Sequence, residues 1–327
     1  ANHIINEKIE FERNPLYWND KETVINSATF LAIENPSTDV ARYRAGDLDM
    51  TSYALPPEQF AKLQKELPGE VFTTRTLATY SYELNNKKAP FDNVNVRKAL
   101  NLSLDRNVIT DKVLGQGQTP TYVFTPTYIE EGQLIQQPAY SKEPMAQRNE
   151  EAIKLLEEAG YSKANPLKFS ILYNTNENHK KVAIAAASMW KANTKGLIDV
   201  KLENQEWKTY IDSRRAGRYD AARAGWNADY NQATTFGNYF LSNSSNNTAK
   251  YANPEYDKAI AESYVATDAE GRAKAYAKAE EILAKDFGIV PIFNYVNPRL
   301  VKPYVKGYSG KDPQDHIYLR NLYIIKH

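Results

Sequence analysis

The chain has 327 residues, a formal net charge of +1 at pH 7 and no cysteine. This length is enough for two domains, and the near-neutral charge gives no reason to expect nucleic acid or an anionic membrane as a partner. Without cysteine there are no disulfides and no thiol nucleophile, and no apolar run approaches the roughly 20 residues of a membrane span. The composition is that of a globular protein and suits export to an oxidising compartment.

The first part of the chain mixes strand and helix patterns. Residues 8–12 and 28–34 have strand character. Residues 58–66 carry apolar side chains at helical spacing, and the following Pro-Gly pair ends that helix. Residues 71–84 are rich in tyrosine and threonine and predict one long strand, which could cross between two lobes.

The next part predicts two helices separated by a long loop. Asp92 or Asn93 can cap the first helix, because a short polar side chain accepts hydrogen bonds from the first turn. Residues 115–145 are rich in Gly, Pro, Gln and Tyr and predict an ordered loop, and 150–159 predict a helix that Gly160 stops. The apolar face of the first helix comprises Val96, Ala99, Leu100 and Leu104.

The rest of the chain alternates strands with helices. We predict strands at 167–173 and 200–206 with a helix at 180–193 between them. A helix rich in Ala, Lys and Glu follows at 269–285, and a strand at 290–296. Such βαβ alternation favours a parallel or mixed sheet with helices packed on it, so the predicted fold class is α/β.

The most informative segment is Ala-Ala-Arg-Ala-Gly-Trp-Asn-Ala-Asp-Tyr at 221–230. It places one acid, Asp229, among small residues, two aromatic side chains and Arg223. A carboxylate in this setting can pair with an ammonium group, while the small residues let an extended ligand approach the backbone. Together with several other segments, this motif closely resembles the periplasmic oligopeptide-binding proteins that feed bacterial ABC importers. Those other segments are 12–18, 43–49, 91–97, 174–179, 203–210 and the tail from 300 to 327.

The resemblance implies a type II periplasmic-binding-protein fold with two lobes of mixed sheet joined by a hinge. Residues 1–80 would belong to the first lobe, 81–296 would form the C-terminal ligand-binding lobe, and 297–327 would return to the first lobe. The chain crossings at the hinge would lie near 80–83 and 294–297.

Members of this family are considerably longer, and the first residue of this chain aligns well inside them. We therefore expect the first lobe to be incomplete, with an N-terminal segment and its signal peptide missing from this sequence. The expected location is the periplasm. The expected partners are short peptides, the membrane permease and ATPase of an ABC importer, and the missing N-terminal segment itself.

The resemblance also assigns the site. Asp229 would bind the α-ammonium of the peptide, and the backbone around Gly225, Trp226 and Asn227 would bond to the extended ligand as an added strand. Trp207 and Trp226 would wall side-chain pockets. The candidates near the peptide carboxylate or polar side chains are Arg223, Arg214 and His179, and further cleft residues are Asn174, Glu83 and Tyr295.

Some of these residues have a structural alternative. An Asp before Tyr in a loop is usually a turn or cap residue, although the surrounding motif reverses that interpretation for Asp229. Trp207 could be half-buried packing, and His179 a solvated residue at a helix start. At least one arginine of the segment around Arg214 is expected to be solvated, and Glu83 could belong to an inter-lobe ion pair.

The two alternative function classes are an enzyme and a binding protein for a different cargo. The chain has no Gly-x-Ser-x-Gly motif, no His-x-x-x-His spacing and no Gly-rich phosphate loop, so a hydrolase has little support and we expect no cofactor, no metal and no catalytic residue. A binding protein for a murein tripeptide or another non-standard cargo on the same fold remains the alternative, because a fold alone does not select the cargo.

Overall fold

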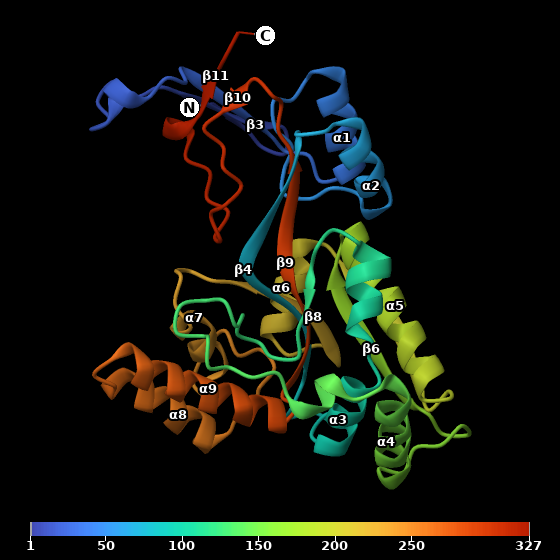
Figure 1. Ribbon diagram of the computed structural model, residues 1–327. Coiled ribbons are helices and arrows are strands. Elements are labelled where there is room, and N and C mark those ends of the chain that lie inside the picture. The colour runs from blue at the N-terminus through green and yellow to red at the C-terminus, as the bar shows by residue number, and fades with distance from the viewer. Residues whose placement is uncertain (1, 327) are drawn as a thin grey trace. The chain divides into compact units, whose positions relative to one another are not determined.

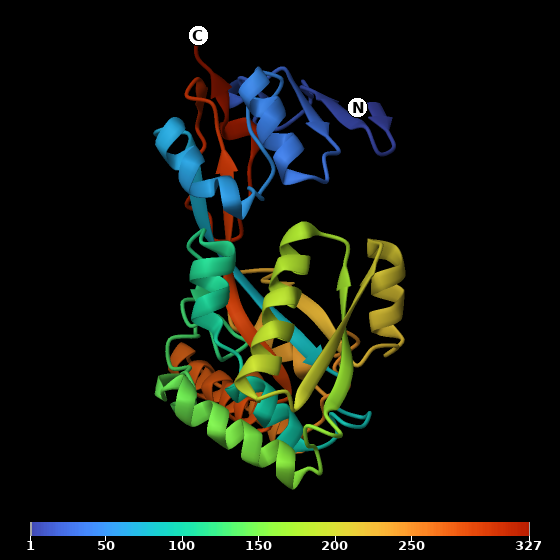
Figure 2. The same ribbon diagram turned by 90° about the vertical axis from the view of Figure 1, so that its right-hand side faces the viewer.

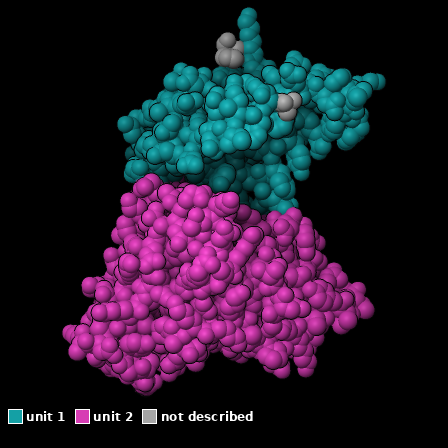
Figure 3. Space-filling model, turned by 180° about the vertical axis from the view of Figure 1, so that it is seen from behind, with its two compact units in different colours: residues 1–76, 296–327 teal, residues 77–295 magenta. Residues whose placement is uncertain are grey.

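The computed structural model describes residues 2–326, which form two compact units (Figure 3). Unit 1 combines the residues up to 76 with those from 296 onward, and unit 2 is formed by Leu77–Tyr295. The chain passes between the units within two long strands, β4 (Val71–Leu84) and β9 (Ile289–Leu300) (Figure 1).

Unit 1 is built from short strands and two helices. Strands β1, β2 and β3 form an antiparallel sheet in that order, and β10 pairs antiparallel with β11. Helix α1 begins at Asn35, whose side chain accepts a hydrogen bond from the Ser37 N–H, and ends at Gly46 in the left-handed conformation. The elements are β1 (Asn2–Ile4), β2 (Lys8–Glu12), β3 (Ser27–Leu31), α1 (Pro36–Ala45), α2 (Pro57–Glu66), β10 (Val305–Lys306) and β11 (Tyr323–Ile324).

The core of unit 2 is a six-stranded sheet in the order β5-β9-β4-β8-β6-β7. Strand β6 runs parallel to both β7 and β8, whereas β8 runs antiparallel to β4, so the sheet is mixed. The strands not yet bounded are β5 (Thr119–Pro120), β6 (Leu167–Asn174), β7 (Ile198–Gln205) and β8 (Ala221–Asn227).

Helices cover both faces of this sheet. Along β6, Ile171 joins the core under α5, while its neighbour Leu172 joins a separate cluster with Tyr210 of α6, because successive strand residues point to opposite faces. Figure 2 shows α5, in yellow-green, and α6, in gold, beside the strands β6 and β7. The helices are α3 (Val94–Leu102), α4 (Met145–Glu158), α5 (Glu177–Asn193), α6 (Trp207–Arg215), α7 (Thr234–Gly237), α8 (Pro254–Val265) and α9 (Ala269–Lys285).

A second core in unit 2 lies under α8 and α9, which run side by side (Figure 1). Phe124 is its centre and contacts Phe236, Tyr239 and Phe240 with ring centroids 4.8–5.2 Å apart. Buried aromatic pairs of this kind add to the free energy of area burial. Phe124 belongs to the predicted loop at 115–145, so these contacts join the loop to α7 and to the turn that follows it.

The structure confirms the α/β prediction and most of the predicted elements. The long strand at 71–84 and the helix at 269–285 have the predicted bounds. The helix predicted at 150–159 begins earlier, at Met145, and Leu104 lies beyond the end of α3. Among the elements that the sequence patterns did not predict are α1, α6, β8 and α8.

Candidate functional site

The candidate site residues gather at one edge of the unit 2 sheet, where β6, β7 and β8 end. Strand β6 ends at Asn174 and is followed by α5, while β7 ends at Gln205 and is followed by α6. Ligands of open α/β sheets bind outside the carboxyl ends of parallel strands, where the helices that follow begin. Asn176 caps α5 and Glu206 caps α6, each accepting two backbone N–H bonds of the first turn.

Arg223 on β8 is the central cation of this edge. Its Nη2 donates to the Tyr295 hydroxyl at 2.5 Å and its Nη1 to the Asn174 side-chain oxygen at 3.4 Å. The guanidinium carbon lies 5.2 Å from the ring centroid of Tyr80. Among the described residues no carboxylate pairs with Arg223, and its buried Nε has no hydrogen-bond partner. A partly buried cation held only by neutral groups is suited to an anionic ligand group.

His179, in the first turn of α5, lies beside Arg223. Its ring centroid is 5.6 Å from that of Tyr80, and its backbone N–H donates to the Asn176 cap. Burial, together with the positive charge of Arg223, lowers the pKa of His179 well below its usual range. The imidazole is therefore neutral at pH 7, so it contributes a hydrogen-bonding group to this edge and no second charge.

Arg214 and Glu83 are bound to each other. Arg214 of α6 donates from Nε and Nη2 to the two carboxylate oxygens of Glu83 on β4, at 2.9 and 2.8 Å. The Glu83 side chain is 0 % exposed, and it also accepts from the hydroxyls of Tyr239, at 2.7 Å, and Thr248. Both partners lie in unit 2, so the alternative of an ion pair between lobes was wrong in its location. A ligand-contact role for either residue stays a prediction.

Asp229 follows β8 in an exposed loop. Its carboxylate accepts a hydrogen bond from the Thr235 hydroxyl at 3.0 Å. The Asp229 backbone N–H donates to the oxygen of that hydroxyl at 3.2 Å. Trp226 lies next to it, half-buried, with its indole N–H donating to the Thr235 carbonyl at 3.0 Å. The indole packs edge-to-face on Tyr239 at 4.8 Å. The structural alternative, in which Asp229 is a turn residue, is thus compatible with the structure. The role of Asp229 in ligand binding stays a prediction.

The backbone at 225–227 lies along β8 and pairs with β4, Gly225 opposite Tyr80 and Asn227 opposite Ala78. The ladder from β6 to β8 joins Ile171 to Ala221 and Leu172 to Ala222. Within the described residues no ladder partner covers 225–227 on the β6 side, so this edge is available for an added strand. A Cβ on Gly225 would lie 3.0 Å from both Arg223 Nη2 and the Tyr295 hydroxyl. Glycine therefore leaves room for the hydrogen bond between Arg223 and Tyr295.

Trp207 is the first residue of α6 and is 55 % exposed. Its ring stacks on Tyr210, with centroids 5.9 Å apart, and the Tyr210 hydroxyl donates to the Arg223 carbonyl. An exposed indole on a buried tyrosine can offer one face to a ligand. The role of Trp207 as a pocket wall stays a prediction. The sequence patterns did not predict a site role for Tyr80, Tyr239, Thr235 or Asn176. Each of these residues contacts a predicted site residue.

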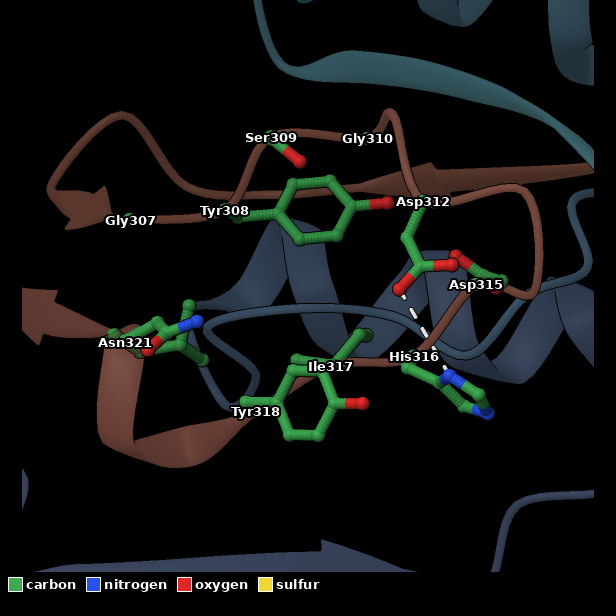
Figure 4. A pocket seen from close by; sticks show the side chains of 11 residues that line it. Gly307, Tyr308, Ser309, Gly310, Asp312, Asp315, His316, Ile317, Tyr318 and Asn321 are labelled. Atoms are coloured by element: carbon green, nitrogen blue, oxygen red, sulfur yellow. Dashed lines mark ion pairs between the residues drawn. The ribbon is translucent and has the colours of Figure 1, made fainter. Parts of the chain in front are cut away.

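Two cavities lie elsewhere, in unit 1. One of about 210 Å³ is lined by the return segment from Gly307 to Leu322 (Figure 4). Figure 4 shows the rings of Tyr308 and Tyr318 and the ion pair between Asp312 and His316, whose atoms are 3.8 Å apart. None of the predicted site residues lines it.

The part of the chain that the structure describes has neither a cluster of metal-ligating side chains nor a helix that could span a membrane. No three or more His, Asp or Glu side chains there come together to hold a metal ion. None of the described helices combines the length and apolar character needed to cross a bilayer.

With this geometry in place, comparison with known proteins decides the family. Residues 2–248 match the family described as bacterial extracellular solute-binding proteins, family 5 Middle. The chain belongs to this family. The mixed α/β fold of the chain is that of solved family 5 structures, and the relatives named next are solute-binding transport proteins.

Among these relatives, the periplasmic oligopeptide-binding protein OppA of Haemophilus influenzae is 97% identical over all 327 residues, which cover 60% of its length. A crystal structure of H. influenzae OppA with the peptide RPPGFSPFR matches with a TM-score of 0.95 and 96% identity, covering 100% of this chain and 64% of that one. The murein tripeptide-binding protein MppA of Escherichia coli matches with a TM-score of 0.93 and 42% identity, covering 100% of this chain and 63% of the other. The chain thus spans about 60% of the length of the curated oligopeptide-binding relatives it matches.

Proposed function

We propose that this family 5 chain is the part of a peptide-binding protein that holds the constant groups of a short peptide. The observation that carries the proposal is the presence of two groups of opposite charge along β8 and the loop that follows it. Asp229 offers an exposed carboxylate, and Arg223 offers a guanidinium with no carboxylate partner among the described residues. A peptide with free ends presents an ammonium and a carboxylate, which are complementary to these two groups.

The strand edge at 225–227 would bind the peptide backbone between its charged ends. Main-chain hydrogen bonds along an added strand are independent of the ligand's side chains, so they give affinity without sequence selectivity. Trp226 and Trp207 would form the walls of pockets for those side chains, where water can fill the remaining space. The support for this role is the ladder, which leaves that edge without a strand partner in the described residues.

Within the predicted set of cations, we assign the ligand carboxylate to Arg223, with His179 and Asn174 beside it. Arg214 would support the site without binding the ligand carboxylate, because two of its three guanidinium nitrogens already donate to Glu83. Tyr295 and Asn174 would orient Arg223 through the two hydrogen bonds they accept from it. Unit 2, which corresponds to the predicted ligand-binding lobe at 81–296, would then supply most of the contacts.

The wider role follows from the relatives, which are named as periplasmic binding proteins. We propose that the whole protein resides in the periplasm, captures peptides there and delivers them to the permease and ATPase of an ABC importer. It would catalyse no reaction itself. The H. influenzae OppA complex with a peptide supports this cargo for the present chain.

A murein tripeptide is the second candidate cargo. The MppA structure matches the fold closely, and a murein tripeptide would also present a free ammonium to Asp229. The sequence favours the general peptide reading, because identity to H. influenzae OppA is 97% and identity to the MppA structure is 42%.

The test is native mass spectrometry of the protein as its gene encodes it, purified without denaturation. We expect a family of bound masses that fragment as mixed short peptides with free amino ends. A single mass carrying diaminopimelic acid would favour the murein candidate. Release of no peptide, together with no binding of added tripeptides in a calorimeter, would overturn the proposed function.

A further inference from the structure

A hidden hydroxyl lies behind the predicted ammonium anchor. Thr235 belongs to the short helix α7 and is 5 % exposed, so it cannot itself be a surface contact. Its hydroxyl oxygen lies 3.0 Å from the Asp229 carboxylate, 3.2 Å from the Asp229 backbone nitrogen and 3.3 Å from the indole nitrogen of Trp226. Three polar atoms therefore converge on one side chain, one from Trp226 in β8 and two from Asp229 in the loop that follows.

The chemistry of these neighbours fixes the direction of each hydrogen bond. A hydroxyl has one proton to donate and two lone pairs that accept. The Asp229 backbone N–H and the Trp226 indole N–H can only donate, so they occupy the lone pairs. The hydroxyl proton is then directed at the remaining neighbour, the Asp229 carboxylate oxygen. The hydroxyl is thus held as a donor to an ionised carboxylate, which is a strong kind of hydrogen bond.

The backbone of Thr235 completes the arrangement. Its carbonyl accepts the Trp226 indole N–H at 3.0 Å, so a single residue contacts both the anchor and an aromatic wall of the proposed site. The loop that carries Asp229 is attached on either side by backbone bonds, from Ala228 N–H to Leu77 O at 2.8 Å and from Ala233 N–H to Glu130 O at 3.0 Å. Within that frame, the Thr235 hydroxyl donates to the Asp229 carboxylate.

We propose that Thr235 is a positioning residue that aims the Asp229 carboxylate at the ligand ammonium and keeps Trp226 beside it. This inference rests on the proposed function, in which Asp229 binds the peptide's amino end. A carboxylate held in its binding geometry before the ligand arrives loses less conformational freedom on binding. Thr235 therefore contributes to affinity without touching the peptide, and its contribution applies to ligands with a free ammonium.

The experiment compares a free tripeptide with the same tripeptide acetylated at its amino end, in the protein as its gene encodes it. Thr235→Val keeps the shape and removes the hydroxyl, whereas Thr235→Ser keeps the hydroxyl. We expect Thr235→Val to reduce the preference for the free peptide by about tenfold, since a hydrogen bond to a charged group is lost. Thr235→Ser should keep the preference within about twofold. In an Asp229→Asn background, Thr235→Val should cause no further loss of preference.

The outcomes separate this inference from the function on which it rests. A parent protein that does not distinguish the two peptides overturns the role of Asp229, and the role of Thr235 with it. A parent that distinguishes them, while Thr235→Val distinguishes them equally well, overturns the role of Thr235 alone. If Thr235→Val does not fold, Thr235→Ala takes its place. A Thr235→Ser protein that loses the preference as fully as Thr235→Val or Thr235→Ala also overturns the proposal.

Discussion

The two arginines at the site differ in how their charges are satisfied. Arg214 is bound through two nitrogens to Glu83, whereas the Arg223 guanidinium has no carboxylate partner in the described residues and donates to a tyrosine hydroxyl and an amide oxygen. The residue types alone could not distinguish them, because the partner of Arg214 lies 131 positions away in sequence. The Thr248 hydroxyl on Glu83 is 165 positions away. Tertiary packing, which the sequence patterns do not show, decides which arginine is left for a ligand.

The Glu83–Arg214 pair gives a stability prediction. Glu83→Gln should lower the free energy of unfolding by about 3–5 kcal/mol, because it leaves the Arg214 charge buried without its carboxylate. Glu262→Gln is the matched control, since the Glu262–Lys278 pair has side chains 43% and 46% exposed. That change should cost less than about 1 kcal/mol. Urea unfolding measures both values, and equal losses in the two variants would show that the buried pair is not a main support.

His179 gives a pH prediction. Its pKa is lowered well below the usual 6.5 in the folded protein, so below about pH 6.5 the unfolded chain takes up a proton that the folded one does not. The free energy of unfolding should therefore fall as the pH drops from 6.5, by at most about 1.4 kcal/mol per pH unit from this residue. His179→Gln should show a flatter dependence between pH 7.5 and 5. If the free energy of unfolding depends on pH equally in the two proteins, the pKa of His179 is not lowered by folding.

At the scale of elements, apolar spacing predicted most of the long helices but did not predict α1, α6 or α8, although α8 buries one face through Tyr256, Ala259 and Ile260. Helix α6 buries only Tyr210 and Ser213, so its sequence has no stripe to recognise. Helices α1 and α8 do carry a start signal, because an asparagine cap is followed by proline at Asn35-Pro36 and Asn253-Pro254. Reading those signals would have found both helices. Strand β8 has small residues on a buried sheet, which do not alternate in the usual way.

The start of α5 is an element whose geometry serves the site. The Asn176 side chain accepts from the N–H groups of Asn178 and His179. Asn176→Ala should lower the free energy of unfolding by about 1 kcal/mol, because the first turn loses its cap, while Asn176→Ser should keep most of it. Hydrogen exchange at the His179 amide should quicken in the alanine variant. An alanine variant with unchanged stability and exchange would show that the cap does not hold this turn.

At the scale of the whole molecule, the resemblance of the motifs predicted the family and the α/β fold, and both are confirmed. The assignment of individual residues to ligand contacts stays a prediction, because the structure holds the protein's own contacts only. What the structure adds is the arrangement of the predicted residues on one unit. Asn174, Arg223 and Tyr295 come from β6, β8 and β9 and meet through hydrogen bonds.

Selectivity is a property of the complete binding protein. If main-chain and terminal groups carry the directional contacts, tripeptides that differ only at the middle residue should bind within about 3 kcal/mol of one another. A calorimetric series with glycine, leucine, lysine and glutamate at that position would measure the spread. A wider range, with one side chain strongly preferred, would point to a dedicated pocket and away from backbone recognition.

The central claim is that Asp229 binds the amino end of a peptide. Its most direct test is a calorimetric titration of the protein, as its gene encodes it, with a tripeptide and with the same tripeptide acetylated at its amino end. The account predicts that acetylation weakens binding by about 2–5 kcal/mol, and that Asp229→Asn weakens binding of the free peptide to a similar extent. The control is Asp199→Asn, whose exposed carboxylate pairs with Lys191 at 3.5 Å and should leave both affinities unchanged. Equal binding of the free and acetylated peptides by the unmodified protein would contradict the account.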